Sequence, residues 1–148
     1  MAAEQNHDLE PLLANQQSQL SLVFSDSDAI DTKALTILGA NIAIIIFINQ
    51  TSAGLALWEY LALYGPFTVS LVLNVISVWP RRYKSIGVSE VRLAQYINMP
   101  REQLLLKLLA NTQAAIVHNT RLNRFRTRIC LYSICLTGLG FLTLLFIL

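Results

Sequence analysis

Residues 129–148 read ICLYSICLTGLGFLTLLFIL, a run of 20 residues without a single charged side chain. A transmembrane helix needs roughly 20 mostly apolar residues to cross about 30 Å of hydrocarbon. This run therefore predicts a membrane-spanning helix. The composition agrees, because 14% of the 148 residues are charged, where a soluble domain has about 25%.

Two earlier runs have a similar character. Residues 61–79 carry no charge and are followed by Pro80. Residues 34–52 contain two asparagines and are only just long enough to span the bilayer. The alternative for this run is a half-inserted hairpin with residues 53–58, which its many isoleucines make less favourable. The sequence thus predicts an all-α integral membrane protein with three transmembrane helices, 34–52, 61–79 and 129–148, and a cytoplasmic helical extension.

The basic residues set the orientation of these spans. Ten of the eleven Lys and Arg residues lie within residues 80–128, and none lies between the first two apolar runs. Loops rich in Lys and Arg stay on the cytoplasmic side of a membrane. We therefore expect residues 80–128 and the N-terminal residues 1–33 to be cytoplasmic, and the C-terminus to be periplasmic or extracellular.

Both cytoplasmic parts have apolar stripes with helical spacing. Residues 1–33 predict an amphipathic helix that continues unbroken into the first span, with Pro11 in its first turn. Its apolar face comprises Leu12, Leu13, Leu20, Val23, Phe24 and Ile30.

The second stripe follows Pro100, a residue that suits a helix start. It comprises Leu105, Leu108, Leu109, Thr112, Ala115, Ile116 and Asn119. Neither Gly nor Pro occurs in residues 101–137, so one helix of about 48 residues, roughly 70 Å long, is expected to reach the C-terminus. Residues 88–98 predict a shorter amphipathic helix.

No constellation of catalytic or metal-binding residues emerges from the sequence. His7 and His118 each lack the partners that nucleophilic or metal chemistry requires. Cys130 and Cys135 are five positions apart, which turns them away from each other on a helix. We therefore expect no enzyme activity, no catalytic residues, no metal and no cofactor.

Charged residues flank the spans in two groups. Arg121, Arg124 and Arg128 have i, i+3, i+7 spacing and so line one side of a helix. This arginine stripe is typical of the cytoplasmic flank of a span, or it binds an anion such as a lipid headgroup or a nucleotide phosphate. The acidic residues Asp26, Asp28 and Asp31 precede the first span, either as solvated surface or as partners of arginines at the same depth.

Polar residues inside the spans should turn toward protein, because lipid offers them no hydrogen bonds. Asn41 and Asn74 are expected to face one another or a neighbouring subunit. Gly39 and Ala43 have a small-xxx-small spacing that favours close helix packing, either within one chain or between copies.

Residues 29–35, AIDTKAL, lead directly into a span that contains an asparagine. The Asp31, Lys33 and Ala34 pattern resembles the Asp-x-Lys-Ala entry of the small membrane effectors of Pycsar (pyrimidine cyclase) antiphage systems. Residues 104–128, a long helix with Asn119 and a basic run before the last span, look like the corresponding helix of that family.

The resemblance implies a defence effector of the bacterial inner membrane. A partner nucleotide cyclase acts through its diffusible product, cyclic CMP or cyclic UMP, and the effector then impairs membrane integrity. Arg121, Arg124 and Arg128 are the candidate phosphate contacts, and Asp31, Lys33 and Ala34 lie at the coupling point. Lipid and further copies of the chain are the expected partners, and nucleic acid is not.

The alternative is a scaffold, a membrane protein whose cytoplasmic helices recruit a partner while the spans anchor it. An activated effector should depolarise the membrane, and a scaffold should not. A membrane enzyme would need a cluster of catalytic groups.

Overall fold

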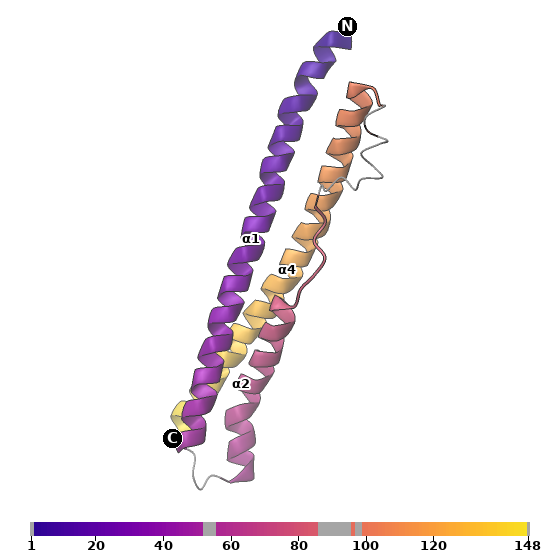
Figure 1. Ribbon diagram of the computed structural model, residues 1–148. Helices are drawn as coiled ribbons and strands as arrows, with labels where there is room; N and C mark the ends of the chain where they lie inside the picture. The colour runs from indigo at the N-terminus through magenta and orange to yellow at the C-terminus, as the bar shows by residue number, and fades with distance from the viewer. Residues whose placement is uncertain (1, 52–55, 86–95, 97–98, 148) are drawn as a thin grey trace. The chain divides into compact units, whose positions relative to one another are not determined.

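The computed structural model describes residues 2–51, 56–85, 96 and 99–147. Its principal elements are three α-helices, α1 (Ala2–Thr51), α2 (Leu57–Val78) and α4 (Arg101–Ile147) (Figure 1). All three are long and apolar enough to cross a membrane, and the described residues contain no strand. The predicted all-α class with three spanning helices is confirmed.

Helix α1 is continuous over 50 residues, which confirms that the N-terminal helix runs into the first apolar segment. The helix begins at Ala2, so the placement of Pro11 in the first turn was wrong, and Pro11 lies inside the helix. Proline removes one helical hydrogen bond. Because Pro11 is exposed, solvent can satisfy the carbonyl group that loses its partner.

Helix α4 is also continuous, over 47 residues, as predicted. Helix α2 begins at Leu57, ahead of the charge-free run, and the Glu59 carboxylate accepts a hydrogen bond from the Ala56 backbone N–H at 2.7 Å. It ends before Pro80, which has no N–H to donate. Most of the amphipathic helix predicted over residues 88–98 lies outside the described residues.

The chain packs as two compact units. Unit 1 comprises residues 1–26 and 81–123, and unit 2 comprises residues 27–80 and 124–148. In unit 1, Gln16 Nε2 of α1 donates to Gln113 Oε1 of α4 at 3.3 Å, and Arg101 forms an ion pair with Glu10. The α4 stripe faces inward as predicted, with Leu105, Leu109, Thr112, Ala115 and Asn119 buried and Leu108 and Ile116 half-buried.

The apolar face predicted for the start of α1 is only partly correct. Leu20 is buried, and Leu13, Val23 and Phe24 are half-buried. Leu12, however, is 51% exposed. Between Leu13 and Leu20, the residues of α1 that share this face are polar, so the start of the helix buries less than its leucine content predicts.

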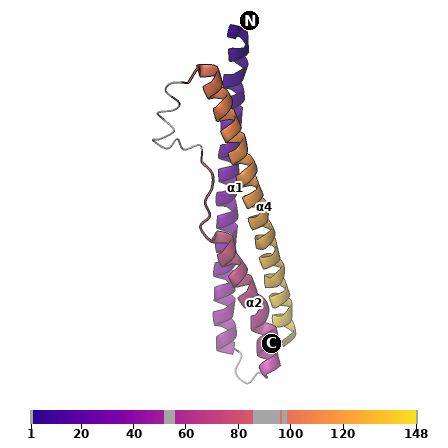
Figure 2. The same cartoon turned by 90° about the vertical axis from the view of Figure 1, so that its right-hand side faces the viewer.

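Unit 2 brings the C-terminal part of α1 together with α2 and the C-terminal part of α4, which lie side by side in both views (Figures 1 and 2). Buried positions in α1 recur every seven residues, and those in α2 alternate in steps of four and three. This is the heptad pattern of coiled helices that wrap left-handedly around each other. The residues are Ser27, Ala34, Asn41 and Ile48 in α1, and Leu63, Phe67, Ser70, Asn74 and Ser77 in α2.

Candidate functional site

The arginine stripe is open to solvent. Arg121 in unit 1 and Arg124 and Arg128 in unit 2 are all exposed on α4. None of the three has a hydrogen bond or an ion pair with any other residue that the structure describes. Exposed guanidinium groups can bind carboxylate or phosphate oxygens in a two-pronged manner. The stripe therefore remains a candidate anion-binding surface.

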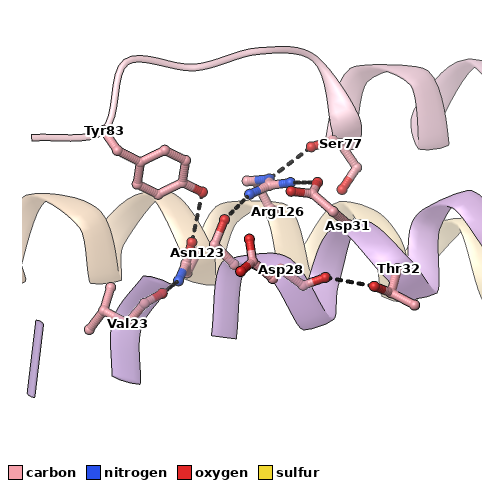
Figure 3. Close-up of polar contacts among 9 residues, drawn as sticks. Val23, Asp28, Asp31, Thr32, Ser77, Tyr83, Asn123 and Arg126 are labelled. Atoms are coloured by element: carbon pink, nitrogen blue, oxygen red, sulfur yellow. Dashed lines mark hydrogen bonds and ion pairs between the residues drawn. The ribbon is translucent and has the colours of Figure 1, made fainter. Parts of the chain in front are cut away.

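A fourth arginine of the same basic run, Arg126, points the other way. Only 2% of its surface is exposed, and its guanidinium bonds to both other helices of unit 2 (Figure 3). Nη1 donates to Ser27 Oγ of α1 at 2.7 Å, and Nε donates to the Ser77 carbonyl of α2 at 2.8 Å. Nη2 forms an ion pair with the Asp31 carboxylate of α1. Arg126 thus joins all three helices of unit 2.

The position of each partner follows from helix geometry. Ser27 and Asp31 are four residues apart on α1, so both side chains reach the same side of that helix. The Ser77 carbonyl belongs to the last turn of α2, where carbonyl groups lack intrahelical partners and the helix dipole attracts a cation. The predicted pairing of an acidic residue with an arginine is confirmed for Asp31. Its partner is Arg126, which is not part of the predicted stripe.

The other two motif residues have different surroundings. Ala34 is fully buried on the seven-residue repeat of α1. Lys33 is exposed and lines a groove of about 230 Å³ between α1 and α4, together with Ile30, Thr127, Cys130, Leu131 and Ile134. Asp28, one helical turn before Thr32, is exposed, and its carbonyl accepts the Thr32 hydroxyl at 2.9 Å (Figure 3). Of the motif, Asp31 alone has its side chain in an ion pair with Arg126.

In unit 1, two buried asparagines of α4 hold other parts of the chain. Asn119 accepts the Lys84 N–H at 3.0 Å and donates to the Lys84 carbonyl at 2.9 Å. Asn123 accepts the Tyr83 hydroxyl at 2.9 Å and donates to the Val23 carbonyl of α1 at 2.8 Å (Figure 3). The segment that follows α2 is therefore fixed to α4 through Tyr83 and Lys84.

Both intramembrane asparagines are fully buried, so the expectation that they turn toward protein is confirmed. Asn41 Nδ2 donates to Ser70 Oγ of α2 at 2.7 Å, and Asn41 Oδ1 accepts the Thr137 hydroxyl of α4 at 3.0 Å. Asn41 does not bond to Asn74, since its amide group bonds to Ser70 and Thr137; the alternative, that the asparagines face a neighbouring subunit, stays a prediction. Neither amide atom of Asn74 has a hydrogen-bond partner among the described residues.

The residues that the structure describes do not bring three His, Cys, Asp or Glu side chains together in a group that could hold a metal ion. The exposed arginines are chemically suited to an anion, and Arg126 links the three helices of unit 2. Sequence reasoning missed Arg126, although Arg126 lies seven residues after Asn119 and so falls on the same buried side of α4. It also missed Ser70, Ser133 and Thr137, which hydrogen-bond within the spans.

A family model described as the Pycsar effector protein domain matches residues 15–148. No curated protein and no solved structure matches the chain. The matched region contains the Asp31 motif and residues 104–128, which carried the resemblance in the sequence, together with α2, α4 and α1 from residue 15 onward. The chain belongs to the Pycsar effector family and is a membrane protein of antiphage defence.

Proposed function

We propose that the protein responds to a cyclic pyrimidine mononucleotide, cyclic CMP or cyclic UMP, and then impairs the integrity of the bacterial inner membrane. The observation that supports this most is the buried guanidinium of Arg126. It belongs to the helix that carries the arginine stripe, and it bonds to α1 and α2 at once. A change in the packing of α4 in unit 2 would therefore act on all three spans.

The ligand binds through its phosphate in this proposal. A cyclic mononucleotide has one phosphodiester group with a single negative charge, and arginine is the side chain best suited to bind such a group in two places. Arg121, Arg124 and Arg128 are exposed and have no carboxylate partner among the described residues, so no internal ion pair has to be broken first.

Binding alters function only if the ligand prefers one helix arrangement over another. The ion pair between Arg126 and Asp31 supplies an interaction that differs between two such arrangements, because it is made only when α1 and α4 are packed as in unit 2. We infer that the inactive state keeps this pair and that the ligand favours a state in which it is rearranged.

The proposed orientation follows from the distribution of Lys and Arg. The N-terminus and the segment from residue 80 to residue 128 are cytoplasmic, and the C-terminus is periplasmic or extracellular. The ligand then comes from a cyclase inside the cell. The effector itself performs no chemical step in this scheme, and it acts as a homo-oligomer.

Calorimetric titration of the purified protein in detergent tests the ligand. We expect cyclic CMP or cyclic UMP to bind and cyclic AMP to bind at least about tenfold more weakly, a difference of roughly 1.4 kcal/mol. If neither pyrimidine nucleotide binds, the proposed ligand is wrong. The scaffold alternative would then account better for a membrane protein with exposed cytoplasmic arginines.

A further inference from the structure

The buried face of α2 is polar toward its C-terminal end and apolar toward its N-terminal end. Ser70, Asn74 and Ser77 are fully buried, and so are Phe67 and Leu63 on the preceding turns. With a rise of 1.5 Å per residue, the polar part from Ser70 to Ser77 covers about 10 Å of the helix axis. A buried polar face of this length is unusual within a span, because lipid and neighbouring apolar side chains provide no hydrogen bonds.

The other two helices of unit 2 supply polar side chains to the same region. Ser70 Oγ lies 2.6 Å from Ser133 Oγ and 2.9 Å from Thr137 Oγ1, both of α4. Asn41 of α1 bonds to Ser70 and Thr137. We call this set the polar seam. It consists of Asn41, Ser70, Asn74, Ser77, Ser133 and Thr137.

Asn74 is the member of the polar seam whose side chain is least satisfied. Its Oδ1 and Nδ2 atoms and the Ser77 hydroxyl are buried and have no hydrogen-bond partner among the described residues. The Asn74 amide and the Ser77 hydroxyl together offer three donor hydrogens and several acceptor positions, and such groups in a protein interior bond to water or to an ion when no protein group is available. The seam therefore contains groups suited to a small polar ligand.

An apolar plug, defined as Ile48, Leu63 and Phe67, follows the polar seam along the helices. The three side chains are fully buried, and Ile44, Ile45, Tyr64 and Leu144 pack against them. The Phe67 ring lies directly over Gly140 of α4, where a Cβ atom would be only 2.7 Å from the ring. Narrow apolar constrictions of this kind stop water and ions in membrane pores.

We propose that the polar seam is the path along which water and small monovalent cations cross unit 2 when the protein is active, and that the apolar plug is its gate. Amide and hydroxyl oxygens of the seam replace the water around a cation, with Asn74 as a coordination point. Phe67 must leave Gly140 for the gate to open. The inference rests on the proposed membrane-impairing function and adds the route and the closing residues.

The test uses the full chain in phosphatidylethanolamine and phosphatidylglycerol vesicles loaded with potassium, without any nucleotide. Phe67→Asn makes the plug polar and should release potassium at least about tenfold faster than the wild type. The matched control is Phe47→Asn, since Phe47 precedes Ile48 in α1 but is 51% exposed. This control should release potassium at the wild-type rate.

A second substitution examines the seam itself. Adding Asn74→Leu to Phe67→Asn should return the release rate to that of the wild type, because an apolar side chain then blocks the path. A leak that persists in the double variant overturns the path, and equal leaks from Phe67→Asn and Phe47→Asn overturn the gate.

If Phe67→Asn fails to give a helical, monodisperse protein, Leu63→Asn opens the same plug and carries the same expectation. Absence of a leak from a folded plug variant also overturns the proposal. These assays contain no nucleotide. A negative result therefore overturns the path or its gate but does not bear on the binding of nucleotide, which the calorimetric titration tests separately.

Discussion

The Arg126 guanidinium and the Asp31 carboxylate form an ion pair between α4 and α1 in unit 2 (Figure 3). The arginine side chain is almost completely buried, whereas the Asp31 side chain is 36% exposed. Removing one partner of a buried pair is costly because it leaves the other charge without compensation. The pair is therefore a point where a small chemical change should loosen the helix packing.

Asp31→Asn should lower the free energy of unfolding by about 2–3 kcal/mol, less than the 3–5 kcal/mol typical of a fully buried pair, because water reaches Asp31. Thermal unfolding in detergent, followed by circular dichroism, measures this. Asp28→Asn removes the same charge one turn away at an exposed position and should change stability little. Equal effects of the two substitutions would contradict the importance of the pair.

Gly140→Ala should destabilise unit 2 by about 1–3 kcal/mol, because overpacking forces buried neighbours to shift. The added methyl group would lie 2.7 Å from the buried Phe67 ring. Gly138→Ala is the matched control, since a Cβ atom there meets nothing within 4 Å. The control also reports the helix-propensity gain of about 1 kcal/mol that both substitutions share. Denaturation in mixed micelles compares the two, and a Gly140→Ala protein as stable as Gly138→Ala would contradict the close contact.

Asn119→Leu should release the segment that follows α2. The substitution removes both hydrogen bonds to the Lys84 backbone, each worth about 1 kcal/mol, so local opening should rise roughly tenfold or more. Limited trypsin digestion measures this as faster cleavage after Arg81, Arg82 and Lys84. Val117→Leu changes a nearby residue of α4 that is 59% exposed and should leave the cleavage rate unchanged. Unchanged cleavage in Asn119→Leu would show that Asn119 does not hold the segment.

Neutralising the arginine stripe should weaken binding of cyclic CMP or cyclic UMP. A hydrogen bond to a charged group contributes about 1.5–3 kcal/mol, so the triple substitution to Gln at Arg121, Arg124 and Arg128 should raise the Kd at least about tenfold. A triple substitution to Gln at Arg82, Lys84 and Lys107 removes the same charge elsewhere. If both triple variants bind equally well in calorimetry, the stripe is not the phosphate site.

The helices themselves could be predicted from the sequence, and some of their ends could not. Apolar length and the absence of Gly and Pro were enough to predict α4 as one helix, because both properties are local. The start of α2 was missed because the second span was predicted from its charge-free run, residues 61–79, which leaves out Glu59. An acidic residue in the first turn instead stabilises a helix start through the helix dipole and, here, the Ala56 N–H.

The arginine stripe was predicted to line one side of a helix, and its three residues are exposed on α4, but the role of Arg126 was not predicted. A basic run next to a span is normally solvated, and composition cannot single out a member that turns inward. The heptad pattern could have predicted that Arg126 turns inward. Its position follows Thr112 and Asn119 and precedes Ser133, each at a step of seven residues, and all four are buried. Its partners come from α1 and α2, and only the assembled unit 2 shows them.

The central claim is that a cyclic pyrimidine nucleotide makes this protein impair the membrane. Inverted inner-membrane vesicles test it most directly, because their cytoplasmic face is outward and added nucleotide reaches the proposed site. With a membrane-potential dye and an energised membrane, wild-type protein should cause depolarisation after addition of cyclic CMP or cyclic UMP, and not after cyclic AMP. An unchanged potential with every nucleotide, in vesicles that contain folded protein, would contradict the account.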